Sequence, residues 1–138
     1  AALATLGPCG VKRHRARAVL PADLSSLRRS RALVEQWLTA WTQVGLIPVT
    51  QVIITAFVEN VLAHATSWPQ VRLETDGTTV TVAVEDDARA QASVRETTHG
   101  CERPSGLRIV NALCRHWGNA PTPSGKTVWA VVGPENRL

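Results

Sequence analysis

The sequence is poor in cysteine and contains no methionine. Its 138 residues include three cysteines, Cys9, Cys101 and Cys114, which are odd in number and never spaced as C-x-x-C. This pattern argues against a zinc ribbon, a redox motif and the disulfide framework of a secreted protein, so we expect a reducing, cytoplasmic setting. Because methionine is absent even at position 1, we expect that the start was trimmed or that the chain was cut from a longer protein. We expect residues 1–12 to be disordered or foreign to the natural protein, and one domain to span 13–138.

Aromatic residues and long apolar runs are also scarce. Aromatic residues make up 4% of the chain, with five Trp, one Phe and no Tyr. Trp117 and Trp129 are expected to lie in the core. Apolar runs such as residues 52–54 are too short to span a bilayer, and no leader pattern is visible, so we expect no membrane role. A chain of this length forms a core without help from disulfides or metal.

Positive charge is concentrated in the first part of the chain. The net charge is +4, yet residues 1–31 hold seven Lys or Arg against Asp23 alone, and the remainder is slightly acidic. A basic segment can steer nucleic acid or an acidic protein partner. No aromatic residue interleaves these arginines to stack bases. A solvated strand and helix surface is therefore favoured over a nucleic-acid surface.

Hydrophobic periodicity predicts a strand and two helices in the first half of the chain. Residues 15–20 alternate in character as an exposed strand does. A helix is expected over about 23–44, with Asp23 as its N-cap and Gly45 in the position of a C-cap glycine. A second helix is expected over about 48–65, because apolar residues recur there three and four positions apart.

A hairpin and a long loop are expected next. Residues 71–73 and 80–84 alternate with period two, and Asp76-Gly77 between them predicts a two-residue β-hairpin turn. Residues 87–104 lose all apolar periodicity and are expected to form a long mobile loop. Loops of that length in compact domains are usually functional and often act as lids.

The last third is expected to hold one helix and one strand. Helical spacing runs from Ser105 through Trp117 and ends at Gly118, and a turn over 121–125 leads to a strand over 126–132. Together these elements predict an α/β fold, a two-layer sandwich in which a mixed, mostly antiparallel sheet packs against helices.

Polar residues on the second helix form the first candidate site. Ala56, Asn60 and His64 are spaced four residues apart and so share one helix face. The Asn60 amide oxygen suits a magnesium ion that keeps most of its waters, and His64 is placed to meet phosphate charge. The alternative is that both are ordinary polar residues that bond to a neighbouring loop.

Two further positions are candidates for binding. Asp86 ends an apolar strand and opens into the long loop, where a carboxylate can accept a hydrogen bond from an exocyclic amine or hold a metal. A turn or capping role is the alternative. Ser105-Gly106-Leu107 lies at a helix N-terminus, where free backbone N–H groups favour anions, although Gly106 could equally be a flexible start to the helix.

The order of these segments resembles the motif boxes of the Bergerat-fold ATPases, also called the GHKL or histidine kinase-like superfamily, which includes gyrase, the heat-shock chaperone ATPase, histidine kinases and MutL. The closest likeness is to the small, single-domain anti-sigma factor serine kinases of actinobacterial type, and it covers about residues 15–132. The matching segments are 56–65, the strand that ends at Asp86, 105–110, Trp117-Gly118 and 125–129.

The resemblance implies a site for ATP and Mg²⁺. Its residues would be Asn60, His64, Asp86, Gly106, Leu107, Lys126 and Thr127. In the family the helix asparagine, here Asn60, holds magnesium, and the strand aspartate, here Asp86, receives the adenine amine. The family's threonine near the adenine matches Thr127. The phosphates would meet the helix start, the histidine and the lysine of this set.

The sequence departs from the family pattern at positions that matter for catalysis. The general-base glutamate falls on Ala56, and Glu59 points about 100° further round the helix. Two loop glycines of the family fall on Ala88 and Ala90, and another falls on Pro104. Loss of a positioned base costs about 10²- to 10⁴-fold in rate. We therefore assign no catalytic residue and expect nucleotide binding to survive better than serine kinase activity.

Three functions remain open. The first is an anti-sigma-factor-like regulator of transcription and stress response, cytoplasmic and homodimeric, that binds ATP-Mg, a sigma factor and an anti-anti-sigma protein. The second is a nucleotide-independent interaction module, a pseudo-kinase of the same fold, whose basic residues 12–31 dock an acidic partner. The third, a nucleic-acid-binding domain that uses the same basic residues, is disfavoured by the lack of interleaved aromatics.

Overall fold

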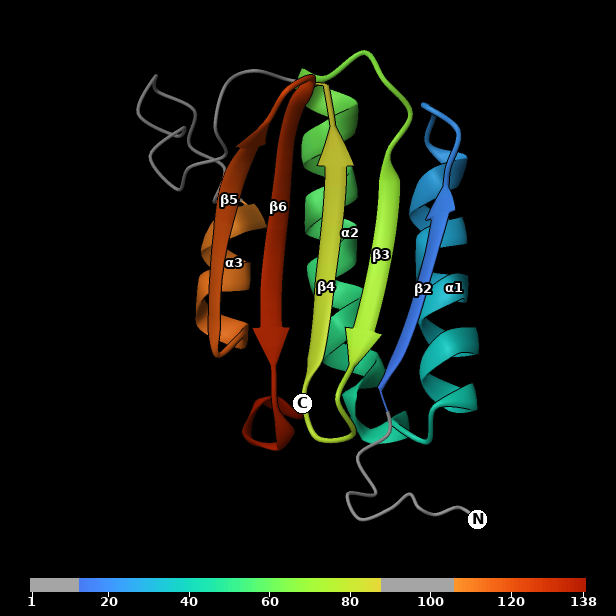
Figure 1. Cartoon of the computed structure of the whole chain (residues 1–138), viewed down its shortest axis with the longest axis vertical. Coiled ribbons are helices and arrows are strands. Elements are labelled where there is room, and N and C mark those ends of the chain that lie inside the picture. The colour runs from blue at the N-terminus through green and yellow to red at the C-terminus, as the bar shows by residue number, and fades with distance from the viewer. Residues whose placement is uncertain (1–12, 88–105) are drawn as a thin grey trace.

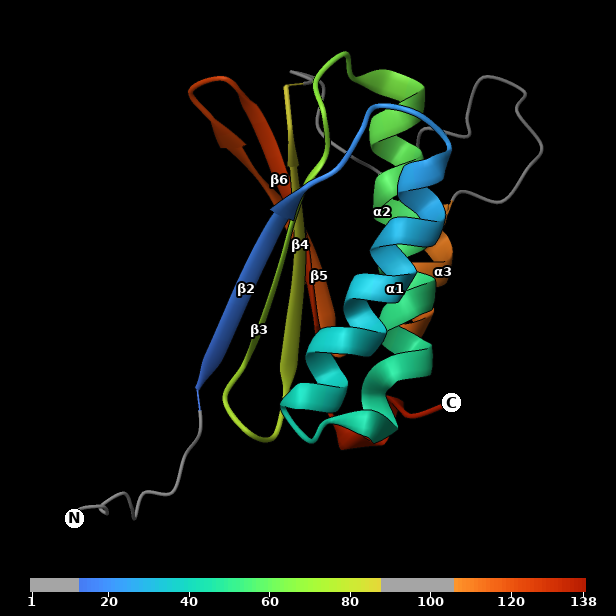
Figure 2. The same ribbon diagram turned by 90° about the vertical axis from the view of Figure 1, so that its right-hand side faces the viewer.

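The described residues form a five-stranded sheet with three helices on one face (Figure 1), and Figure 2 shows the two layers edge-on. The computed structural model describes residues 13–87 and 106–138. The elements are β2 (His14–Val19), α1 (Ser25–Ala40), α2 (Ile47–His64), β3 (Gln70–Thr75), β4 (Val80–Asp86), α3 (Gly106–Leu113), β5 (His116–Thr122) and β6 (Gly125–Val132), with short 3-10 helices at Val44–Leu46 and Pro134–Asn136.

The strands follow the spatial order β2-β3-β4-β6-β5, and each neighbouring pair is antiparallel. The expected α/β class and two-layer sandwich are confirmed. The described strands contain no parallel pair, so this part of the sheet is antiparallel rather than mixed. Short hairpin connections join β3 to β4 and β5 to β6, whereas α1 and α2 lie between β2 and β3 in the chain, and α3 and β5 lie between β4 and β6.

Helix α2 lies at the centre of the core. It contacts α1, α3 and the middle strands β4 and β6, and its buried side chains include Ile53, Phe57 and Val61. Alternate residues of the sheet, such as Val82 and Ala130, are buried on the face that the helices cover. The alternate strand residues on one face of the sheet therefore pack against the wide apolar surface of α2 to form one core.

The segment Val44–His64 is long and apolar enough to cross a membrane by length and composition, with a mean hydropathy of 1.7. The expectation that no apolar segment reaches this length is therefore wrong. Half of the segment is buried inside the domain. A helix that packs against neighbours on several sides must be apolar around most of its surface, so its place in the core accounts for its composition.

Helix α1 begins two residues later than expected. The Asp23 carboxylate accepts a hydrogen bond from the backbone N–H of Ser25 at 2.8 Å, so it supports the start of the helix from just outside it. Ser26 and Ser30 are fully buried, and each hydroxyl donates to a backbone carbonyl three residues earlier. Small, internally satisfied side chains on this face let α1 approach its neighbours closely.

The end of α1 differs from the prediction. The helix ends at Ala40, and Thr42 adopts a left-handed conformation with φ of 56°. The N–H of Gln43 donates to the carbonyl of Leu38 at 2.8 Å, which is the long bond of a Schellman motif. The expected cap, Gly45, lies instead inside the following 3-10 helix. The sequence misled because threonine occupies the position where glycine is usual.

The β3–β4 hairpin is confirmed, with a longer loop than expected. Residues 76–79 connect the strands, rather than two residues. The Asp76 carboxylate accepts hydrogen bonds from the N–H groups of Thr78 (2.9 Å) and Thr79 (2.8 Å), and Gly77 has φ of 98°. The Asp-Gly pair located the hairpin because both residues stabilise turns, but their identity did not set the loop length.

The largest correction concerns residues 116–122, which form strand β5 rather than the end of a helix. Helix α3 stops at Leu113, and Gly118 pairs with Trp129 of β6 instead of capping the helix. Trp117 packs against the core as expected. Trp129 does not: it is half-buried on the helix-free face of the sheet, with its ring 5.5 Å from that of His116.

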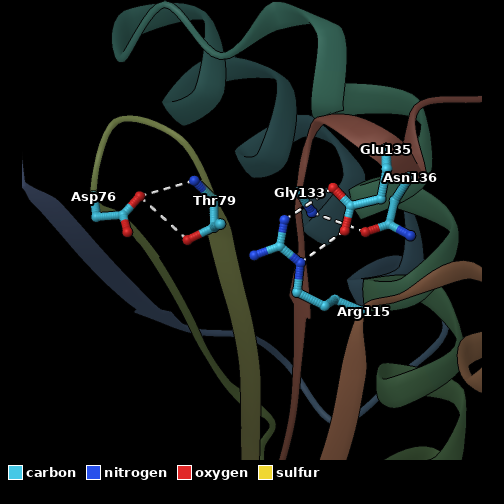
Figure 3. Close-up of polar contacts among 6 residues, drawn as sticks. All are labelled: Asp76, Thr79, Arg115, Gly133, Glu135 and Asn136. Atoms are coloured by element: carbon cyan, nitrogen blue, oxygen red, sulfur yellow. Dashed lines mark hydrogen bonds and ion pairs between the residues drawn. The ribbon is translucent and has the colours of Figure 1, made fainter.

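The C-terminus is tied to the end of α3 by an ion pair (Figure 3). The Arg115 guanidinium donates to both carboxylate oxygens of Glu135, with Nε–Oε2 at 2.7 Å and Nη2–Oε1 at 2.9 Å. The Asn136 side chain accepts a hydrogen bond from the N–H of Gly133 at 2.8 Å. The bidentate contact with Arg115 holds the pKa of Glu135 well below its ordinary value, at about 2.

The conformation of Thr42 predicts a stabilising substitution. Thr42 is exposed and left-handed, a conformation that glycine adopts without the steric penalty of a Cβ. Thr42→Gly should raise the free energy of unfolding by about 0.5–1 kcal/mol in urea titrations. Gln36→Gly, at an exposed position inside the same helix, should lower it by a similar amount. Equal destabilisation by both substitutions would contradict the Schellman assignment.

The Arg115–Glu135 pair predicts an acid-sensitive contact. The pKa of Glu135 is lowered from 4.5 to about 2, so the stabilisation is present above the unfolded value and is lost as the pH falls toward 2. A carbon-13 NMR titration of the Glu135 carboxyl should show a midpoint near 2. Arg115→Gln should move that midpoint back toward 4.5, and Arg137→Gln should leave it unchanged. A wild-type midpoint already near the unfolded value would refute the pairing.

Candidate functional site

The residues expected to bind nucleotide come from elements that meet at one end of the domain. Strand β4 runs toward this end and finishes at Asp86, and α2 finishes there at His64 (Figure 1). Strand β6 begins there at Gly125, because it runs antiparallel to β4 and pairs Asp86 with Lys126. Helix α3, which begins at Gly106, contacts α2. The fold thus gathers most of the predicted set.

Asp86 and Lys126 form a buried ion pair at this end. The Lys126 Nζ lies 2.8 Å from Asp86 Oδ2, and the two side chains are only 2% and 0% exposed. Both side chains lie on the face of the sheet that the helices cover, as the alternation with the core residues Val84 and Val128 shows. Sequence reasoning placed both residues in the site but assigned them to different parts of a ligand; it missed that they bond to each other.

The α2 residues of the predicted site differ in exposure. Ala56, at the expected position of the base, is 92% buried within the core, with 8% of its surface exposed. Asn60 is half-buried and His64 is exposed, and neither side chain forms a hydrogen bond with another described residue. The polar stripe therefore runs outward along α2, from a buried methyl group to a solvated imidazole.

The remaining predicted residues, Gly106, Leu107 and Thr127, lie in different environments. Leu107 is 3% exposed and belongs to the hydrophobic core, so its side chain contributes packing. Gly106 is the first residue of α3. Thr127 follows Lys126 in β6 and therefore points to the opposite face, where it lines a depression with Glu85. The structure does not bring Thr127 together with the Asp86 carboxylate.

The backbone next to Asp86 is tightly held. The Asp87 carboxylate accepts hydrogen bonds from the N–H groups of Thr66 (3.0 Å) and Ser67 (3.1 Å) and from the Thr66 hydroxyl (2.7 Å). These bonds, the Thr66 hydroxyl first, lower the pKa of Asp87. A Cβ built on Gly125 would lie 1.9 Å from the Asp86 carbonyl oxygen, so only glycine fits there. The end of β4 is therefore fixed from two sides.

The described residues fit an ATP-Mg group poorly at the adenine position. An adenine amine would need the Asp86 carboxylate, which is buried and already bonded to Lys126. The part of the chain that the structure describes holds no cluster of three or more His, Cys, Asp and Glu side chains suited to a metal. A magnesium ion held by one amide oxygen, water and phosphate does not need such a cluster, so Asn60 stays a possible ligand.

Several expectations concern residues outside the described ranges. These are the disorder of residues 1–12, the lid over most of 87–104, and the replaced glycine positions Ala88, Ala90 and Pro104. The phosphate-facing part of the predicted site therefore consists, within the described residues, of the start of α3, the Asn60 face of α2 and Lys126.

The helix-free face of the sheet is a second candidate surface. Two shallow depressions lie on it, with volumes of about 260 and 370 Å³. Residues lining the first include Arg17, Val19, Gln70, Arg72, Ala83 and Glu85, and residues lining the second include Arg13, His14, Arg15, Glu74 and Thr81. Sequence reasoning found the basic residues of this region, but the contribution of Arg72 came only from strand pairing.

A scan against models of protein families finds no match, and a search of curated proteins finds no similar sequence.

The buried ion pair predicts an asymmetric effect of its two removals. Lys126→Met removes the ammonium group bonded to the buried Asp86 carboxylate and should lower the free energy of unfolding by about 3–5 kcal/mol. The double variant Asp86→Leu/Lys126→Met should lose much less, because it removes both charges together. As a control, Arg15→Met, which removes an arginine side chain that is 70% exposed from its ion pair with Glu74, should cost at most about 1 kcal/mol. Equal losses for Lys126→Met and Arg15→Met in urea titrations would contradict the pair.

Proposed function

We propose that the chain is an anti-sigma-factor-like regulatory protein with a histidine kinase-like fold that acts by binding protein partners and does not transfer phosphate. One observation carries the proposal: Asp86, the residue that the resemblance assigns to the adenine amine, is buried in an ion pair with Lys126. The apolar Ala56 at the base position points the same way. An incoming amine would have to reach a desolvated carboxylate that already accepts a hydrogen bond from Lys126.

The architecture supports the kind of module proposed. A two-layer sandwich with α2 against the centre of the sheet, β4 ending in Asp86 and α3 following along the chain has the order that the resemblance leads us to expect. The implied partners are a sigma factor and an anti-anti-sigma protein, and the implied state is a cytoplasmic homodimer that regulates transcription in a stress response. These partner classes rest on the resemblance alone.

Binding of ATP-Mg, with residual serine kinase activity, is the second candidate. The half-buried side chain of Asn60 forms no hydrogen bond with another described residue, and the exposed His64 lies one turn further along the same face. The amide oxygen of Asn60 is therefore available to a magnesium ion, and the imidazole of His64 is available to phosphate. In this candidate Lys126 would leave Asp86 and turn toward the nucleotide.

The two candidates differ in a thermal-shift measurement. A ligand that binds only the folded state raises stability by RT ln(1 + [L]/Kd), so nucleotide at about 100 times Kd adds about 2.7 kcal/mol. We expect the wild-type Tm to stay unchanged with Mg-ATP at about millimolar concentration. A shift that Asn60→Ala abolishes and the exposed control Gln36→Ala preserves would overturn the nucleotide-independent proposal and establish the second candidate.

The regulatory part of the proposal needs its own assay. RNA polymerase reconstituted with each sigma factor of the source organism should be inhibited by the protein in one case, and the inhibition should be the same with and without ATP. Inhibition that requires ATP would favour the second candidate. Absence of inhibition for every sigma factor would refute the anti-sigma role while leaving the nucleotide result untouched.

A further inference from the structure

The outer edge of β2 is basic and is not paired with any strand of the described residues. In the strand order β2 is terminal, so one side of its backbone pairs with β3 and the other pairs with no described strand. Figure 2 faces this edge, with β2 in front and helix α1 beside it rather than over it. Unpaired strand edges are templates for another extended chain, because they present a row of free N–H and C=O groups.

The register shows which backbone groups face outward. The N–H of Leu20 donates to the carbonyl of Pro69 at 2.8 Å, one step beyond the register that pairs Val19 with Gln70. Hydrogen-bonded and non-hydrogen-bonded pairs alternate along an antiparallel ladder. The backbone groups of Ala16 and Ala18 therefore point toward β3. Those of Arg15, Arg17 and Val19 point to the outer edge.

The side chains of the same outward-bonding residues determine the charge of the edge. Arg15 and Arg17 share the helix-free face, where Arg17 forms no ion pair with a described residue and Arg15 shares Glu74 with Arg72 at 3.4 and 3.0 Å. Arg15 is 70% exposed. An added strand would place alternate side chains directly opposite Arg15 and Arg17, with their Cβ atoms about 5 Å apart. Opposite charges stabilise such cross-strand pairs.

The helix side of this edge is apolar. His14 stacks on Trp41 with ring centres 5.6 Å apart, and Trp41 stacks on Trp37. Trp37, Trp41 and Ala18 are partly buried hydrophobic residues that pack against the core. An added strand would therefore have apolar residues on one face and acidic residues on the other.

A second copy of this chain is a poor occupant of the β2 edge, because its own β2 is basic, whereas an acidic strand would complement the arginines there. Across such an edge, residues whose backbone groups point outward pair with one another. The two antiparallel β2–β2 registers of this kind with the fullest overlap place Arg17 opposite Arg17, or Arg15 opposite Arg17, and like charges directly opposite each other are destabilising. At the other end of the sheet, β5 carries Pro121, which lacks an N–H and weakens that edge as a template. Charge and hydrogen-bond capacity thus single out β2.

We propose that the outer edge of β2 docks an extended acidic segment of a protein partner, with Asp or Glu at alternate positions, which joins the sheet as an additional strand. The inference rests on the proposed function only in that a regulator acting through partners needs a docking surface. It requires neither a nucleotide nor Asp86, so its test is separate from the nucleotide test.

Peptide binding tests the proposal. The probe is a fluorescein-labelled eight-residue peptide of alternating glutamate and valine, with two controls: alternating lysine and valine, and the same glutamates and valines grouped in two blocks. Fluorescence anisotropy should show binding of the first peptide alone, weaker at about 1 M than at about 0.1 M salt because exposed charges are screened. Arg15→Glu/Arg17→Glu should weaken binding about tenfold or more and should favour the lysine peptide. Arg28→Glu/Arg29→Glu, on exposed positions of α1, should leave it unchanged.

Amide hydrogen exchange gives the structural readout. In the free protein the amides of Ala16 and Ala18 should be protected and those of Arg15, Arg17 and Val19 should exchange fast. Bound peptide should protect the second set. The proposal is overturned if the alternating peptide does not bind, if it binds without protecting those three amides, or if they are already protected in a concentration-dependent dimer. Stronger binding of a DNA or RNA oligonucleotide, without that alternating protection, would also overturn it.

Discussion

The packing of α2 against the middle of the sheet is the interaction on which the rest of the structure depends. This helix touches α1 on one side, α3 on the other and the strands β4 and β6 beneath it. Its apolar surface, with Ile53, Phe57 and Val61 buried, is the largest contribution that any single element makes to the core. Because α2 also carries Asn60 and His64 outward from that core, the same packing determines where the polar stripe meets the ends of β4 and α3.

The ion pair between Asp86 and Lys126 is the second constraint. Unlike the apolar packing of α2, it depends on two specific, mutually compensating charges. Apolar packing is tolerant of exchange between similar side chains, whereas two charges in a core must satisfy each other or destabilise the domain. The pair sits where the resemblance leads us to expect adenine recognition. The carboxylate that the resemblance assigns to adenine is thus engaged in the packing of the domain, and this is why we propose a function based on protein contacts rather than on phosphoryl transfer.

The two faces of the sheet differ in burial and charge, and its two edges differ in their capacity to pair with another strand. One face is buried under the helices. The other carries Trp129 and two shallow depressions whose linings include arginines and glutamates. One edge contains a proline, whereas the other presents free backbone groups beside Arg15 and Arg17. The excess of positive charge near the start of the chain thereby becomes a property of one strand edge and of helix α1.

Much of the fold was readable from local patterns. The alternation in 71–73, 80–84 and 126–132, the helical spacing across α2, and the Asp76-Gly77 pair each reflect short-range physics, so they predicted the elements and the α/β class. The predictions of secondary structure were wrong where contacts with segments distant in the chain outweigh the local propensity of the residues. Residues 116–122 contain Gly118, Asn119 and Pro121, which are poor strand formers, yet they pair with β6.

The candidate site shows the same division. The sequence by itself determined which chemical groups are available: one helix with Asn60 and His64, one strand ending in a carboxylate, and a basic first segment. Only the tertiary structure decided that Lys126 points at Asp86, that Thr127 points away from it, and that Arg72 lies beside Arg17. The physical reason is that side-chain direction and strand register are decided by packing and by hydrogen bonds between segments far apart in the chain, which no local pattern records.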